Sequence, residues 1–124
     1  MQQLLVAGLG GFIGSACRFW FSSVTYRVLG QNFPYGTLFV NVLGCLLIGL
    51  LMTVFENRFL VSPNLRIFLT VGILGGFTTF STFSFETVSL LQEGSFLIAG
   101  ANILASVLIC LAATWFGGAI GKLI

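Results

Sequence analysis

The fold of this chain is decided by one stretch, Gly72-Ile73-Leu74-Gly75-Gly76-Phe77-Thr78-Thr79-Phe80-Ser81-Thr82-Phe83-Ser84-Phe85-Glu86. It lies in an apolar run over residues 65–91 that is long enough to cross a bilayer as a helix. The paired glycines at 75 and 76 each cost about 1 kcal/mol relative to alanine in a helix interior. The β-branched, aromatic and hydroxyl residues that follow them are poor helix formers. We therefore predict that this membrane-spanning helix is broken near its middle.

A break at membrane depth has chemical consequences. Lipid offers no hydrogen bonds, so irregular backbone is tolerated there only where it lines a site or a cavity. Freed carbonyl oxygens suit a hard cation such as Na⁺, whereas freed amides and hydroxyls suit an anion. This stretch alone leaves both kinds of site open.

Three further apolar runs cover residues 4–29, 36–55 and 95–120. Of the 124 residues, 57% are hydrophobic and 6% are charged, whereas a typical soluble domain has about 25% charged residues. We therefore expect an all-α membrane protein with four transmembrane helices, forming a single integral membrane domain over residues 1–124. The net charge of +2 is too small and too scattered for a surface that binds nucleic acid.

The connections between the four runs are short. Ser62 and Pro63 predict the start of the third helix, with Ser62 as the N-cap and Pro63 at the first helical position. An even number of spans places both termini on one side. The loop cations divide three to one between the two sides, with Arg58, Arg66 and Lys122 on the terminal side and Arg27 opposite. This split is a weak orientation signal, and it is compatible with insertion in both directions.

Polar residues recur at every fourth position in two of the spans, so that each set shares one helix face. The second span carries Thr37, Asn41, Cys45 and Gly49, and the fourth carries Asn102, Ser106, Cys110 and Thr114. Such residues commonly join helices by hydrogen bonds inside a membrane. Two such rows also favour a polar track along which a dehydrated anion moves between donors. The spacing does not decide between these interpretations.

Three kinds of side chain inside the spans admit both a structural and a functional interpretation. Arg18 lies deep in the first span, where an arginine costs about 2.5–3.5 kcal/mol, and it either snorkels to the interface or sits in a vestibule that concentrates anions. Phe80 and Phe83 share a face, and they either pack or offer positive ring edges to an anion. Glu86 either pairs with a cation or an amide near a pore mouth or snorkels at the end of the span.

Two strings, Gly75 to Ser84 and Gly36-Thr37-Leu38-Phe39-Val40-Asn41-Val42-Leu43-Gly44, resemble the signature of the Fluc (CrcB) family of fluoride channels. The resemblance covers essentially the whole chain. It implies an antiparallel, dual-topology homodimer in the bacterial cytoplasmic membrane, with two pores that are each lined by both subunits. It also implies passive, selective export of fluoride, which protects the cell from its toxicity.

The resemblance further implies roles for individual residues. Phe80 and Phe83 match the phenylalanines along the anion path, and Asn41 matches the pore amide. Gly75 and Thr78 match the positions whose backbone carbonyls hold a structural Na⁺ at the dimer axis. Arg18 matches the vestibule arginine, and Glu86 matches an acid near the pore end. The remaining path residues implied are hydroxyls: Thr37, Thr79, Ser81, Thr82, Ser106 and Thr114. Cys110 departs from the expected serine, and a thiol is a weaker donor.

Three rival classes fit less well. A small multidrug-resistance-type transporter is also a dimer of four-helix chains, but it needs a membrane-embedded acid in the first span, where this chain carries Arg18. A membrane-embedded enzyme would need an acid–base pair, and this chain has no His, no Asp and one intramembrane Glu. A structural assembly subunit would explain the small residues but not the hydroxyls gathered between residues 78 and 84.

Overall fold

The computed structural model describes residues 1–57 and 60–124, so Arg58, one of the terminal-side cations, lies outside the described residues. The helical elements in chain order are α1 (Gln2–Leu29), α2 (Tyr35–Asn57), α3 (Pro63–Ile67), the π-helical segment η1 (Phe68–Leu74), α4 (Gly75–Phe77), α5 (Phe80–Gln92) and α6 (Phe96–Leu123). Within the described ranges there is no β-strand. By length and composition, four helices are able to cross a membrane: α1, α2, the composite Pro63–Gln92 and α6. The prediction of an all-helical chain with four candidate membrane-spanning helices is confirmed.

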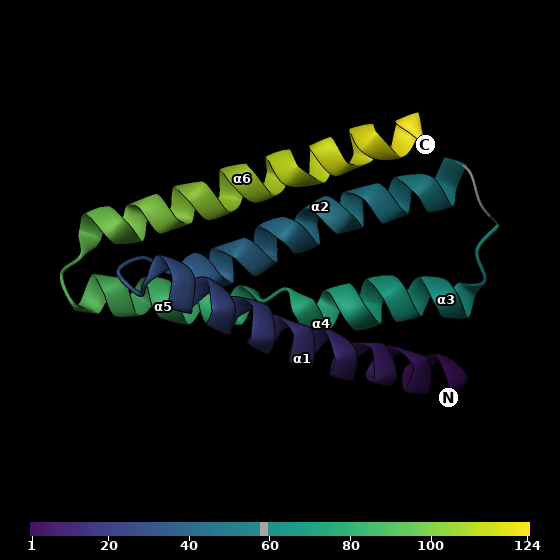
Figure 1. Ribbon diagram of the computed structural model, residues 1–124, viewed down its shortest axis with the longest axis horizontal. Coiled ribbons are helices and arrows are strands. Elements are labelled where there is room, and N and C mark those ends of the chain that lie inside the picture. The colour runs from purple at the N-terminus through teal and green to yellow at the C-terminus, as the bar shows by residue number, and fades with distance from the viewer. Residues whose placement is uncertain (58–59) are drawn as a thin grey trace.

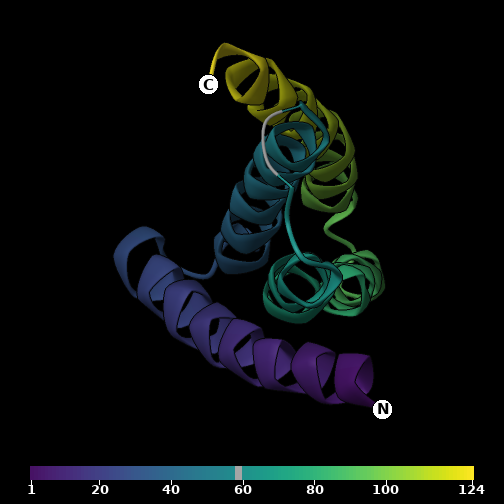
Figure 2. The ribbon, with the colours of Figure 1, turned by 90° about the vertical axis from the view of Figure 1, so that its right-hand side faces the viewer.

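The four spans form two packed pairs. α2 and α6 run side by side, while α1 lies across η1 and α4, and both termini lie at the same end (Figures 1 and 2). Glycines allow these helices to approach closely. A Cβ at Gly49 of α2 would overlap the Thr114 carbonyl of α6, and a Cβ at Gly14 of α1 would overlap the Ile73 carbonyl of η1. Backbone therefore meets backbone in both pairs, as small residues permit in membranes.

The start of the third span agrees with the sequence. The Ser62 hydroxyl accepts a hydrogen bond from the Leu65 N–H at 3.2 Å, and Pro63 follows as the first helical residue. This confirms the predicted N-cap. The hairpin into α6 turns at Gly94, whose φ of 82° lies in the left-handed region that favours glycine.

The middle of the third span departs from regular helix at two threonines. α4 ends at Phe77, Thr78 and Thr79 have extended backbone (ψ 159° and 117°), and α5 begins at Phe80. The glycines that motivated the prediction are themselves helical, because α4 begins at Gly75. Gly76 instead serves packing, since a Cβ there would lie 2.7 Å from the Gly11 carbonyl oxygen of α1.

Candidate functional site

The extended backbone at Thr79 is held by one side chain. Asn41, in the second turn of α2, accepts from the Thr79 N–H at 2.7 Å through Oδ1 and donates to the Thr79 carbonyl at 3.0 Å through Nδ2. In a continuous helix the Thr79 N–H would bond to the Gly75 carbonyl, four residues earlier. Asn41 takes that place, so the Gly75 carbonyl loses its regular helical partner. Asn41 therefore acts as a two-point clamp on the extended backbone.

The clamp borders a cavity that we call the phenylalanine hollow, with a volume of about 340 Å³. It is lined by Asn41, Cys45, Thr78, Thr79, Phe80, Phe83, Ser106, Val107, Cys110 and Leu111. The Phe80 and Phe83 rings lie 5.3 Å apart, tilted by 49°. Phe83 is 9% exposed, whereas Phe80 is 77% exposed. α2, α5 and α6 thus bring together five of the residues predicted for the anion path, namely Asn41, Thr79, Phe80, Phe83 and Ser106.

A second cavity, the arginine hollow, has a volume of about 390 Å³ and contains Arg18. Its other lining residues are Ser15, Phe19, Ser22, Thr37, Val40, Thr79 and Thr82. The Arg18 guanidinium donates a long hydrogen bond of 3.4 Å to the Thr78 carbonyl. Because Thr79 lines both hollows, they meet at the extended backbone. The Thr79 hydroxyl also accepts from the Thr82 N–H at 3.2 Å, which caps α5.

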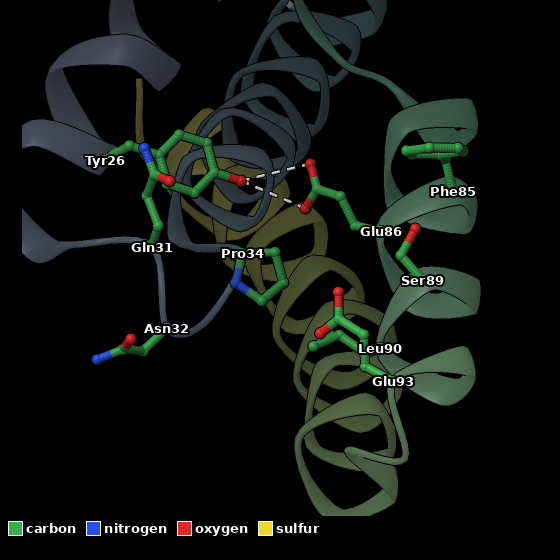
Figure 3. A pocket seen from close by; sticks show the side chains of 9 residues that line it. All are labelled: Tyr26, Gln31, Asn32, Pro34, Phe85, Glu86, Ser89, Leu90 and Glu93. Carbon is green, nitrogen blue, oxygen red and sulfur yellow. Dashed lines mark hydrogen bonds between the residues drawn. The ribbon is translucent and has the colours of Figure 1, made fainter.

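Glu86 lies in a third cavity, the glutamate hollow, of about 460 Å³ (Figure 3). The Thr37 hydroxyl donates to Glu86 Oε1 at 2.6 Å, and the Tyr26 hydroxyl approaches both carboxylate oxygens at 3.3 Å. Tyr26 was not among the predicted site residues. Gly36 makes room for it, since a Cβ there would overlap the Tyr26 ring. The sequence offered only a weak indication of this contact, because Tyr26 lies near the end of the first span and Glu86 follows 60 residues later.

A chain of buried side chains connects α6 to α5. The Ser106 hydroxyl donates to Asn102 Oδ1 at 3.4 Å, Asn102 Nδ2 donates to Thr87 Oγ1 at 2.9 Å, and the Thr87 hydroxyl donates to the Phe83 carbonyl at 2.7 Å. Asn102 stood in the predicted polar row but was not assigned to the anion path, and Thr87 was missed. Only the position of Thr87, one turn after Phe83, could have suggested it.

Three predicted residues lie outside these contacts in a single chain. Thr114 lines a groove between α2 and α6 of about 600 Å³, together with Gly49 and Lys122. Ser81 is exposed, with its hydroxyl 3.3 Å from that of Thr79. Gly75 is exposed at the start of α4. No group of three His, Cys, Asp or Glu side chains that could hold a metal occurs in residues 1–57 and 60–124. The roles of individual residues in an anion path stay predictions.

Four apolar helices, each long enough to cross a bilayer, define a multi-pass membrane protein. The family model described as "CrcB-like protein, Camphor Resistance (CrcB)" matches residues 5–118, and the chain belongs to this family. This confirms the resemblance seen in the sequence.

Three similar proteins share the name "Fluoride-specific ion channel FluC". The protein of Geotalea daltonii is 50% identical over 124 residues, which is the full length of both chains. That of Geobacter sp. (strain M21) is 50% identical over 117 residues, 94% of each chain, and that of Geotalea uraniireducens is 48% identical over 122 residues, 98% of each. These relatives are named as ion channels and not as enzymes, and the chain is a multi-pass bacterial membrane protein.

Proposed function

We propose that this chain is a subunit of a fluoride-selective channel that lets fluoride leave the cell passively across the bacterial cytoplasmic membrane. One observation carries the proposal within the family: the phenylalanine hollow gathers an amide, two aromatic rings and three hydroxyl residues, from Asn41 to Ser106, beside the extended backbone. A relative that matches the full chain at 50% identity is named a fluoride-specific ion channel.

The lining of the hollow suits a small, strongly hydrated anion. The edges of phenylalanine rings carry positive quadrupole density and attract an anion that lies in the ring plane. The clamp on Thr79 uses one hydrogen of the Asn41 amide, and the second hydrogen is available to the hollow that Asn41 lines. Ring edges and this hydrogen replace the water that fluoride loses. Chloride is larger, so its charge is less concentrated and these donors replace its hydration less favourably.

The two other hollows extend such a path, since the arginine hollow shares Thr79 with the phenylalanine hollow and its Thr37 bonds to Glu86 of the glutamate hollow. Arg18 gives the arginine hollow a positive charge, which concentrates anions at its mouth. In the glutamate hollow, the Tyr26 and Thr37 hydroxyls donate to the Glu86 carboxylate and offset its repulsion of an anion. Ser81 and Thr114 lie away from the phenylalanine hollow of one chain, and we assign them to parts of the path that a second subunit completes.

An antiparallel, dual-topology homodimer is supported by exposure and by charge. Phe80 is 77% exposed in the single chain, so its ring can enclose an anion only when a second surface covers it. Among the described loop cations, Arg66 and Lys122 lie toward the terminal end and Arg27 toward the other, which is a weak orientation bias. Terminal tags that are accessible from both sides of the membrane would support this assembly, and tags accessible from one side only would contradict it.

The third span is proposed to act as a broken helix that presents carbonyls to a structural Na⁺ at the dimer axis. The Gly75 carbonyl suits a cation, because the Thr79 N–H that would bond to it in a regular helix bonds to Asn41 instead. The Thr78 carbonyl already accepts a long bond from Arg18, but a carbonyl oxygen has two lone pairs and can serve both. Bound there, the ion would supply a fixed positive charge between the subunits. Because main chain provides the ligands, Thr78→Ser should retain Na⁺ in a crystal structure, and a wild-type crystal structure without cation density there would contradict the site.

Fluoride flux from liposomes tests the channel itself. The purified protein should pass fluoride down its gradient without a proton gradient, and it should pass chloride far more slowly. Phe80→Ile and Phe83→Ile should each abolish flux while dimer yield stays at the wild-type level, because isoleucine keeps apolar bulk and lacks the ring edge. Phe96→Ile is the matched control, since Phe96 is 68% exposed and lines none of the three hollows.

Each outcome has a clear meaning. Equal chloride and fluoride fluxes, or a strict need for a proton gradient, would contradict a fluoride channel. Flux through Phe80→Ile and Phe83→Ile at the level of Phe96→Ile would show that the two rings only pack.

A further inference from the structure

In the hydrogen bonds that connect α5 and α6, the chemistry of the atoms determines which group donates and which accepts. Thr87 Oγ1 lies 2.7 Å from the Phe83 carbonyl oxygen. Because a carbonyl oxygen only accepts, the single hydroxyl hydrogen of Thr87 lies on this bond. Thr87 Oγ1 can then only accept from Asn102, whose Nδ2 lies 2.9 Å away. Thr87 therefore sets the orientation of the Asn102 amide.

That orientation decides what the Ser106 hydroxyl does. Asn102 Oδ1 faces Ser106 Oγ at 3.4 Å, and because Oδ1 only accepts, Ser106 donates. The Ser106 hydrogen is thus directed toward Asn102. The lone pairs of the Ser106 oxygen then face the phenylalanine hollow, which Ser106 lines. Since lone pairs repel an anion, Ser106 in this arrangement is not a donor to the hollow.

The bond that holds the Ser106 hydrogen is the weakest of the three. Bonds between hydroxyl and oxygen usually measure about 2.5–3.0 Å, and the Ser106–Asn102 bond is 3.4 Å. The other two bonds are shorter, and they join residues that are 2% and 6% exposed, Asn102 and Thr87. The Ser106 hydroxyl can therefore turn by rotation about its own side-chain bond while Asn102 and Thr87 stay in place.

We propose that Asn102, oriented by Thr87, is a positioning residue that keeps the Ser106 hydrogen out of the anion path until an anion competes for it. The inference rests on the proposed fluoride function and deepens it. Ser106 becomes a donor only to an anion whose hydrogen bond is stronger than that to the Asn102 amide. Asn102 thereby adds a small cost to each passage of an anion past Ser106.

A double-mutant cycle with fluoride efflux from liposomes tests this inference. Asn102→Leu removes the acceptor at similar volume and leaves the bond from Thr87 to Phe83 intact. It should raise the fluoride rate about two- to tenfold, the range that one ordinary hydrogen bond gives. In the Ser106→Ala background, Asn102→Leu should change nothing, because there is no hydroxyl to release.

Thr87 supplies the control pair. Thr87→Val removes the group that orients the Asn102 amide, so it should also raise the rate. Thr87→Ser keeps the hydroxyl and should retain the wild-type rate. These two variants decide the question if Asn102→Leu does not fold, which size-exclusion chromatography and circular dichroism would show.

Two results would overturn the inference. If Asn102→Leu lowers the rate, or changes it by the same factor with and without the Ser106 hydroxyl, then Asn102 acts through packing. If Thr87→Val and Thr87→Ser conduct equally, the amide orientation is irrelevant. A wild-type protein that passes no fluoride is a distinguishable failure, because it refutes the proposed function before any variant is compared.

Discussion

The clamp formed by Asn41 predicts a large loss of stability when its amide is removed. Asn41→Leu keeps the side-chain volume, so the cost comes from the two hydrogen bonds of 2.7 and 3.0 Å to the Thr79 backbone. Thr79 is 8% exposed, and water cannot replace these bonds easily. Each buried group left without a partner costs about 1–3 kcal/mol, so the free energy of unfolding should fall by about 2–6 kcal/mol.

The assay is unfolding of the detergent-solubilised protein by sodium dodecyl sulfate, followed by the fluorescence of Trp20 and Trp115. Asn41→Asp keeps an acceptor for the Thr79 N–H but loses the donor to its carbonyl, so it should fall between wild type and Asn41→Leu. Asn32→Leu removes an exposed loop amide and should stay within about 0.5 kcal/mol of wild type.

Flux measured in parallel separates two roles of the same amide. The clamp predicts that Asn41→Leu is both unstable and non-conducting. If Asn41→Leu unfolds like wild type and conducts no fluoride, the clamp reasoning is refuted, and the amide serves the anion alone. If it unfolds like wild type and conducts normally, the side chain has neither role.

Three further predictions use unfolding measured in the same way. Gly14→Ala should lower the free energy of unfolding by at least about 2 kcal/mol, because its Cβ would overlap η1 backbone. Gly8→Ala, with nothing within 4 Å of the added Cβ, should leave it unchanged or raise it by up to about 1 kcal/mol. Equal losses in the two variants would contradict the packing of α1 on η1. Thr37→Val should lower the free energy of unfolding by about 1.5–3 kcal/mol, because the hydrogen bond to the Glu86 carboxylate is lost. Thr37→Ser keeps the hydroxyl and should retain the wild-type stability. Thr79→Val should cost about 1 kcal/mol as a lost cap of α5; a Thr79→Ser variant as unstable as Thr79→Val would exclude capping as the cause.

The architecture could be predicted from the sequence because lipid imposes strong rules. Apolar length predicts the four spans, and the Ser62-Pro63 pair predicts where the third begins. The run after the paired glycines predicted an irregular backbone near the middle of that span. The extended residues are nevertheless Thr78 and Thr79, beyond the glycines. Local propensity cannot locate them, because their backbone partner is Asn41, 38 residues away in the chain.

The row of polar residues on α2 shows a second limit of periodicity. Spacing by four keeps neighbouring members of the row Thr37, Asn41, Cys45 and Gly49 close together. Each step nevertheless drifts by about 40° around a helix of 3.6 residues per turn, so the row winds around α2 and its members meet different partners. Thr37 meets Glu86, Asn41 clamps Thr79, and Gly49 packs against α6. Which partner each member meets depends on long-range packing, which no local pattern contains.

The sequence left open whether these polar rows join helices or carry an anion, and the hydrogen bonds suggest that the two roles are coupled. Among the described residues, no buried side-chain nitrogen or oxygen lacks a hydrogen-bond partner. At Ser106, an anion gains the hydroxyl donor only by displacing its present partner, the Asn102 oxygen. Hydrogen bonds to an ion are about twice as strong as those between neutral groups, and they are strongest for a small anion with concentrated charge. On the proposed function, donors that already have partners therefore exclude weak acceptors such as chloride, and the bonds that hold the helices together also contribute to selectivity.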